Sequence, residues 1–168
     1  MELISPFPEH SVGEAYLWHR YIPTCINGDD CSLPEFTSII FNSLQDPGCL
    51  SWGVTDPLGS VVGMIVMTPI YRCRQLVDGG IHICFARRAW GQGNVEAVSR
   101  TCISQAFTSI PTLMRITAHT PSNYRPSCSA LERVGFQREG TYREGAVIRG
   151  RLTDLAIYGL TRSDWMKG

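Results

Sequence analysis

The turn at residues 87–93 constrains the fold of this chain more than any other part of its sequence. Residues 80–86 form an apolar strand pattern, and the sequence Arg-Arg-Ala-Trp-Gly-Gln-Gly follows at once. A helical pattern then continues to about residue 109. Glycines between a strand and a helix permit a tight turn and a close backbone approach to a ligand. Outward amides and the helix dipole would attract an anion, so we expect a phosphate or pyrophosphate site.

Two familiar phosphate-binding turns differ from this segment. A Walker loop ends in Gly-Lys-Ser/Thr, which the segment lacks. A Rossmann turn requires a third glycine where Glu96 stands, and it belongs to a compact strand-helix-strand unit early in the fold. These differences argue against a nucleotide-binding oxidoreductase. A glycine-rich connection that binds nothing is the structural alternative.

Periodicity and turn residues predict a mixed arrangement of helices and strands. Helices are expected at 10–22, at 34–45, from the glycine turn to about 109, and at 127–134. Strands are expected at 50–55, 60–68, 80–86, 113–120, 136–143 and 151–160, with a further short strand before the first helix. Because strands follow one another directly at both ends of this order, we expect a mixed α/β (α+β) sheet rather than a doubly wound one. A chain of 168 residues builds about one domain, taken as 1–168.

Charge and hydropathy exclude several classes of partner. Lys+Arg and Asp+Glu are equal in number, so the chain lacks the basic excess typical of proteins that bind nucleic acid or anionic membranes. Its apolar runs fall short of the roughly 20 residues that span a bilayer. The first residues, Met-Glu-Leu-Ile-Ser-Pro, do not form a signal peptide. We therefore expect a cytoplasmic protein, either a monomer or a homodimer.

The cysteines and one acidic turn do not predict a metal site. No CxxC pair occurs, so we expect reduced and mostly buried thiols at Cys25, Cys31, Cys49, Cys73, Cys84, Cys102 and Cys128. Residues 27–30, Asn-Gly-Asp-Asp, lack the spaced acidic ligands and terminal glutamate of an EF-hand. A polar turn without metal is the better interpretation.

Two later segments connect the glycine turn to a known family. Residues 131–142 read Leu-Glu-Arg-Val-Gly-Phe-Gln-Arg-Glu-Gly-Thr-Tyr, and residues 150–165 begin Gly-Arg-Leu-Thr-Asp. With Arg88-x-x-Gly91-x-Gly93, they make residues 50–165 similar to the GNAT N-acetyltransferases, and within them to the ribosomal-protein alanine acetyltransferases. The resemblance implies the acyl-CoA N-acyltransferase fold, with a central, mostly antiparallel sheet flanked by helices. It also implies acetyl transfer from acetyl-CoA to a primary amine, a protein N-terminus or a small amine, by direct attack in a ternary complex.

The resemblance also implies where coenzyme A would bind. Its pyrophosphate would lie on the glycine turn, and its pantetheine arm near the start of the helix predicted at 127–134. The family's acidic residue lies one position beyond Glu96, and Tyr124 takes the place of the family's asparagine. The residues expected to contact the cofactor are Phe85, Arg87, Arg88, Ala89, Trp90, Gly91, Gln92, Gly93, Asn94, Asn123 and Ser127.

Acyl transfer to an amine requires a group that accepts the amine proton and one that protonates the departing thiolate. His82 is the candidate base, because it precedes the glycine turn and a histidine titrates near neutrality. A structural strand histidine is the alternative. Ser127 is the candidate thiolate donor or pantetheine contact, although a serine at a helix start is also common. Tyr124 is a second candidate donor.

The acceptor side is less defined by the sequence. The residues that could line it are Asp78, Glu139, Tyr142 and Glu144. Glu139 or Glu144 could also remove the amine proton through ordered water, or no base is needed if the amine arrives neutral. A non-catalytic GNAT fold that binds acyl-CoA or a protein partner is the alternative function.

Overall fold

The computed structural model describes residues 1–8, 11–12, 15, 32–72, 75–91 and 94–167. Most of the helix predicted over 10–22 lies outside these ranges, and so does the polar turn predicted at 27–30. Val12 and Ala15, which belong to that predicted helix, are buried. The positions of Cys25, Cys31, Cys73, Gln92 and Gly93 also fall outside the described residues.

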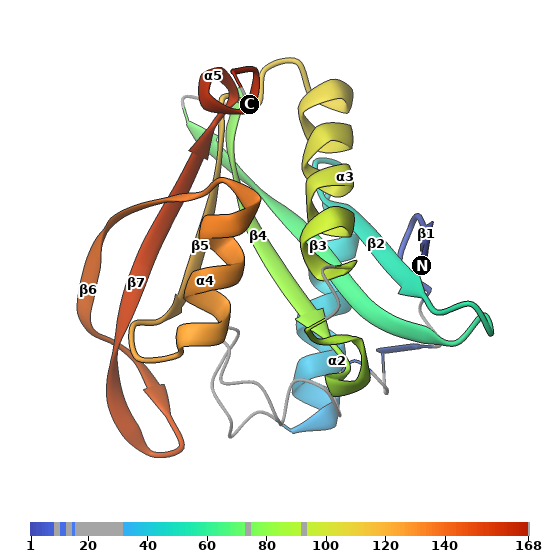
Figure 1. Cartoon of the computed structure of the whole chain (residues 1–168), viewed down its shortest axis with the longest axis horizontal. Coiled ribbons are helices and arrows are strands. Elements are labelled where there is room, and N and C mark those ends of the chain that lie inside the picture. Colours follow the sequence, from blue (N-terminus) through green and yellow to red (C-terminus); the bar gives the residue numbers. More distant parts are fainter. Residues whose placement is uncertain (9–10, 13–14, 16–31, 73–74, 92–93, 168) are drawn as a thin grey trace.

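Seven strands of the described chain form one sheet, in the order β1-β2-β3-β4-β5-β7-β6 (Figure 1). They are β1 (Glu2–Ile4), β2 (Leu50–Thr55), β3 (Val61–Arg72), β4 (Gln75–Phe85), β5 (Arg115–Pro121), β6 (Gln137–Ile148) and β7 (Arg151–Thr161). Neighbouring strands are antiparallel except β4 and β5, which run parallel. The predicted fold class, a mixed and mostly antiparallel sheet with helices, is confirmed.

Several strands run further than the sequence predicts. The strand predicted to end at residue 68 is followed by Pro69, and proline cannot donate to a ladder. In the structure Pro69 lies inside β3 opposite Gly79, and the pairing continues to Arg72 and Gln75. The β6–β7 hairpin extends to Ile148, beyond the predicted end at 143, through an irregular stretch between Tyr142 and Ala146.

The helices begin and end at residues with clear capping roles. Helix α2 (Leu33–Leu44) starts at Ser32, whose side chain accepts from the Glu35 amide in a capping box. Helix α3 spans Asn94–Ser109. Helix α4 (Arg125–Val134) starts two residues before the predicted position because a proline occupies its first turn, and it ends at Gly135 with φ +116°. The 3-10 turn η2 (Arg87–Ala89) and helix α5 (Arg162–Trp165) are too short to predict.

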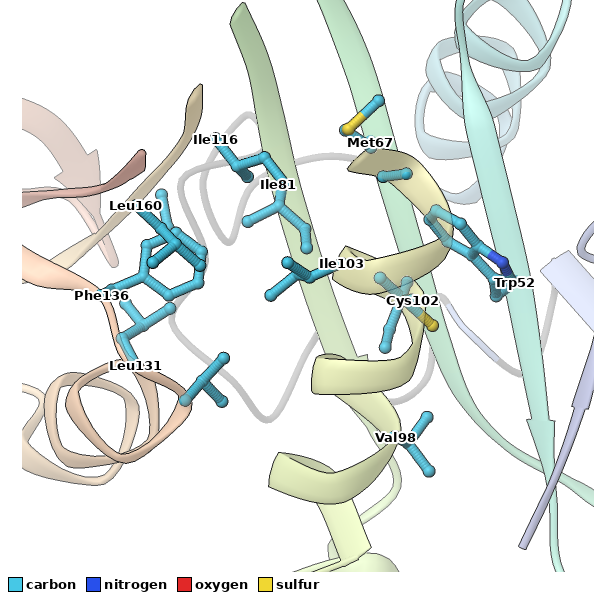
Figure 2. Packing of buried hydrophobic residues seen from close by; sticks show 14 of the residues in the cluster. Trp52, Met67, Ile81, Val98, Cys102, Ile103, Ile116, Leu131, Phe136 and Leu160 are labelled. Atoms are coloured by element: carbon cyan, nitrogen blue, oxygen red, sulfur yellow. The ribbon is translucent and has the colours of Figure 1, made fainter. Parts of the chain in front are cut away.

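Helices α3 and α4 cover one face of the sheet and α2 covers the other (Figure 1). Strand alternation in β4 separates the two cores. Ile81 packs with Ile103 of α3, as Figure 2 shows, whereas Cys84 packs with Ile40 of α2. The alternation therefore places His82 on the Cys84 side.

Arg162 fixes the end of α3 against the sheet. Its guanidinium donates 2.8 Å bonds to the carbonyl oxygens of Phe107, Ile110 and Leu113. These carbonyls lie at and just beyond the C-terminus of α3, where helix carbonyls lack partners within the helix.

Two further expectations concern thiols and membranes. Cys84, Cys102 and Cys128 are buried free thiols and Cys49 is a half-buried one, as predicted for these four positions. No helix among the described residues has the length and apolar character required to cross a membrane.

Candidate active site between strands β4 and β5

The site begins where the two parallel strands separate. β4 and β5 pair only from Asp78 to Gly80 and from Arg115 to Thr117, although β4 continues to Phe85 and β5 to Pro121. Figure 1 shows the strands together at one end and apart at the other, with α4 over the space between them. A cavity of about 750 Å³ lies there, lined by both strands, the turn after β4, α3 and α4.

The glycine turn forms one wall of this cavity. After β4 the chain makes the short turn η2, and the indole Nε1 of Trp90 donates to the carbonyl of Phe85 at 3.0 Å. Gly91 has φ +76°, a backbone conformation that L side chains rarely adopt, and no atom lies within 4 Å of the position its Cβ would take. Phe85, Trp90 and Gly91 line the cavity, and Ala89 is buried beneath them. The described part of the turn therefore lets a ligand come close to the backbone at Gly91, as the sequence predicts.

The two arginines of the turn point to different neighbours. Both are exposed. The Nε of Arg88 lies 4.0 Å from Oδ2 of Asp56, which belongs to the β2–β3 turn. Arg87 lies near enough to Tyr124 for its charge to lower the pKa of that phenol, although burial, the larger effect, raises it. Arg87 is thus the arginine of the turn that lies toward the start of α4.

The start of α4 forms the opposite wall. Tyr124 and Ser127 line the cavity together with Arg125 and Pro126. Asn123 is exposed and does not contribute to the lining. The structure therefore brings Ser127 and Tyr124 to the same cavity as the glycine turn, whereas Asn123 lies outside its lining.

Helix α3 contributes a buried hydroxyl to the lining. Ser99 is fully buried, lines the cavity, and its Oγ has no hydrogen-bond partner among the described residues. Leaving a buried hydroxyl unpaired costs about 1–3 kcal/mol. Beside it, Arg133 of α4 bonds Glu96 of α3, with 2.6 Å between Nη2 and Oε1. The two helices are thus joined at the edge of the cavity, while Ser99 is left available to a ligand.

His82 lies on β4 within the open part of the gap. Burial, with a smaller contribution from the charge of His119, lowers its pKa to about 4. Its ring is therefore neutral at pH 7, whereas the sequence suggested a pKa near the ordinary histidine value. Cys84, two residues further along, also lines the cavity, but burial raises the pKa of its thiol to about 12. A thiol that stays protonated is a poor nucleophile, so the cavity favours direct attack by an external amine.

His119 is a further histidine of the site that was not predicted from the sequence. It lies on β5 across the gap from His82, and it lines the same cavity. Burial lowers the pKa of His119, and the charge of Asp78 acts in the opposite direction. Its ring packs against that of Tyr142, with 5.6 Å between the centroids. The register between β4 and β5 would have placed this histidine near His82, but the sequence of neither strand alone determines that register.

The predicted acceptor-side residues lie on the same sheet face as His119 or at its edge. Asp78 is buried and accepts from the Thr117 hydroxyl at 3.3 Å. Glu139 is bonded to Arg115, with 2.6 Å between Nη2 and Oε2. Glu144 lies further out in the hairpin, where its amide donates to Oδ1 of Asp154 at 2.8 Å. Asp78 and Glu139 are therefore already engaged by protein groups.

Comparison with known proteins identifies the family of this chain. The family model described as acetyltransferase (GNAT) domain matches residues 11–137. A putative ribosomal N-acetyltransferase, YdaF of Bacillus subtilis (strain 168), is 30% identical over 107 residues, which cover 64% of this chain and 57% of that protein. An uncharacterized N-acetyltransferase, p20 of Bacillus licheniformis, is 32% identical over 79 residues, 47% of this chain and 44% of that protein. The matched region thus spans about half the length of these curated relatives.

Solved structures share the fold over nearly the whole chain. The spermidine N-acetyltransferase of Vibrio cholerae, in complex with CoA and spermine, superposes with a TM-score of 0.81 over 98% of this chain and 97% of that one, at 18% identity. A GNAT-family acetyltransferase of Streptococcus pneumoniae gives a TM-score of 0.74 over 95% of this chain and 99% of that one, at 19% identity. At such identities the likeness shows the fold alone.

Proposed function

Since this chain belongs to the acetyltransferase (GNAT) domain family, we propose that it is an N-acetyltransferase, which transfers an acetyl group from acetyl-CoA to a primary amine. The proposal treats residues 1–168 as one catalytic domain. The free thiols at the four described cysteines are consistent with a reducing compartment, and we propose the cytoplasm.

The observation that carries the proposal is the combination of an opened parallel strand pair with a positive-φ glycine at the helix entrance. The gap supplies a cavity deep in the sheet, and Gly91 lets the backbone come close to a bulky anion. Coenzyme A has both a pyrophosphate and an amide-bearing arm, so it needs an anion site joined to a polar channel.

The residues of the cavity fit that cofactor. The turn at Trp90 and Gly91, with the N-terminus of α3, would hold the pyrophosphate, and Arg87 could add a charged donor. Ser99 offers a buried hydroxyl that lacks a partner among the described residues, and Ser127 lies on the facing helix. These two serines would contact the pantetheine arm. When bound, acetyl-CoA supplies an activated thioester.

The protein would position the amine, remove its proton and protonate the thiolate. His82 is neutral at pH 7, so it can accept a hydrogen bond from an amine N–H in the gap. Tyr124 and Ser127 lie at the α4 side of the cavity, where either hydroxyl could donate to the departing thiolate. Holding the amine and the thioester together in the gap would supply much of the rate acceleration.

The acceptor class is a primary amine, a protein N-terminus or a small amine. YdaF carries the name of a ribosomal N-acetyltransferase, and the Vibrio cholerae enzyme that of a spermidine N-acetyltransferase. A protein N-terminus and a polyamine both present a primary amine. Two carboxylates of the described acceptor side, Asp78 and Glu139, are engaged with Thr117 and Arg115 and are therefore less available to the ammonium groups of a polyamine. This favours a peptide N-terminus.

The test combines cofactor binding with turnover. Acetyl-CoA should raise the unfolding temperature of the purified protein, because a ligand that binds only the native state stabilises it, whereas NAD should do so far less. Thiol release should then be followed with spermidine and with short peptides that begin with alanine or serine. Acetylation of the peptides in preference to spermidine is the expected result. Binding without turnover on any amine would instead indicate a non-catalytic acyl-CoA-binding module, and equal stabilisation by NAD would exclude the cofactor.

A further inference from the structure

Two histidines on different strands line the opening of the sheet from the same face. Gly80 and Thr117 are the last paired residues of β4 and β5. His82 and His119 each lie two positions further along, so alternation places both on the face that carries Gly80 and Thr117. Both side chains line the same cavity, and the charge of His119 affects the titration of His82.

The two rings have unequal access to water. His82 is half-buried, and with a pKa of about 4 only about one ring in a thousand would be protonated at pH 7. His82 alone is therefore a weak store for a proton. His119 is exposed at the mouth of the cavity, so a proton on its ring can be hydrated.

The groups around His119 favour the temporary presence of a proton there. From β4, the buried carboxylate of Asp78 opposes the effect of burial on the pKa of His119. From β6, the ring of Tyr142 packs against the imidazole, and from β7 its cross-strand neighbour is the apolar Ile157. Arg115 on the same strand is engaged by Asp78 and by Glu139, which reduces its repulsion of a charged ring.

We propose that His119 takes up, through His82, the proton that leaves the acceptor amine and releases it to solvent. The proposal rests on the proposed function. As the amine nitrogen bonds the acetyl carbon and the carbon–sulfur bond breaks, one N–H proton of the amine moves to a ring nitrogen of His82. The other ring nitrogen of His82 gives its proton toward His119, which passes it to water. His82 returns to a neutral ring, and the sulfur leaves with the bonding electron pair as thiolate.

This role suits the chemistry of a neutral imidazole. Such a ring carries one N–H donor and one unprotonated nitrogen, so it can accept and donate in the same step. His82 does not need to hold a positive charge in its buried position. His119 acts through His82, and its ring is exposed to solvent.

The kinetic test uses His82→Gln, His119→Gln and the double variant with whichever amine the wild-type protein acetylates best. Loss of a positioned proton acceptor costs about 10²–10⁴-fold in turnover, and we expect His82→Gln to fall in this range. His119→Gln should lose about 10-fold or more, and the double variant no more than His82→Gln alone, because residues that act as a unit are not additive. Added imidazole should partly restore His119→Gln, whose site is open to solvent, and leave His82→Gln unchanged. Turnover of His119→Gln within three-fold of wild type, or a double-variant loss equal to the product of the single losses, would overturn the proposal.

A second measurement does not depend on turnover. Ring-proton NMR titration of the wild-type protein and of His119→Gln gives the pKa of His82 in each. If the rings face each other, removal of the His119 charge raises the pKa of His82, and an unchanged pKa would overturn the pairing. Acetyl-CoA titrations should give similar affinities for all variants, which checks that the cofactor site is intact. If the wild-type protein acetylates no amine, the proposed function fails, while the titration still decides whether the two histidines are coupled.

Discussion

The guanidinium of Arg115 reaches across β7 to the carboxylate of Glu139, with 2.6 Å between Nη2 and Oε2. Gly159 of β7 makes room for this bridge, because a Cβ at that position would overlap the Glu139 carboxylate. The same guanidinium lies 3.7 Å, Nε to Oδ2, from Asp78, whose side chain is only 4% exposed, whereas that of Glu139 is 39% exposed. Arg115 thus lies close to two carboxylates, the buried one of Asp78 and the exposed one of Glu139.

This difference predicts unequal effects of two charge-removing substitutions. Glu139→Gln should lower the free energy of unfolding by no more than about 1 kcal/mol, the usual worth of an exposed ion pair. Arg115→Met should lower it by about 3 kcal/mol, because the buried Asp78 carboxylate then loses its nearby positive charge. Urea denaturation at neutral pH measures both. Equal losses would show that the Asp78 contact contributes little.

The lowered pKa of His82 predicts a stability that depends on acid. The folded-state pKa is about 4 and the ordinary value is 6.5, so between these limits the unfolded chain binds a proton that the folded chain does not. Stability should therefore fall as the pH drops from about 6.5 to about 4, by up to about 3 kcal/mol for this group. His82→Gln should remove that part of the pH dependence. The comparison needs unfolding free energies for both proteins at several pH values, and parallel curves would contradict the assignment.

Gly91 permits a test that separates backbone strain from ligand binding. Gly91→Val forces a branched side chain into a left-handed conformation, at a cost of about 1–2 kcal/mol, and places it against the bound phosphates. Acetyl-CoA affinity should fall at least 10-fold. Gly150→Val is the matched control, because Gly150 also has positive φ, +67°, with open space around its Cβ, but lies in the β6–β7 turn. Similar affinities for the two variants in an equilibrium titration would mean that the glycine turn is only a connection.

Ser99→Ala should have opposite effects on the free protein and on the complex. Removing a buried hydroxyl that lacks a partner should leave the unfolding free energy unchanged or raise it by about 1 kcal/mol. If that hydroxyl bonds the pantetheine arm, acetyl-CoA affinity should fall by up to about 10-fold. Ser104→Ala, on the exposed side of the same helix, is the control for both measurements. A loss of stability without a loss of affinity would assign Ser99 a purely structural role.

Much of the fold could be predicted because its signals are local. The order of the elements follows from periodicity, and the positive φ of Gly91 and of Gly135 follows from glycines at a strand-to-helix turn and at a helix end. Strand ends were less predictable, because Pro69 is tolerated in β3 by the register that the strand shares with β4. The local sequence indicates which conformation a residue prefers, whereas pairing with the neighbouring strand determines where the strand ends.

The candidate site shows the same division. Ser127 and Tyr124 could be placed near the glycine turn through the family resemblance, and the structure does bring them to its cavity. His119 could not, since its position opposite His82 depends on which residues of β4 and β5 pair. The pKa of His82 was also beyond reach, because burial sets it and burial is a property of the assembled sheet.

The short pairing between β4 and β5 also has a mechanical consequence. At the closed end, the amide of Met114 donates to the Val77 carbonyl at 2.9 Å and the amide of Arg162 to the Met114 carbonyl at 2.7 Å, so three chain segments are fastened together there. At the open end the two half-sheets diverge around the cavity. The sheet is therefore held firmly where β4 and β5 pair and can open more easily where they diverge. A ligand bound between the diverging strands would suppress their opening. Amide hydrogen exchange should then slow in the unpaired parts of β4 and β5, while the paired end keeps its original rate.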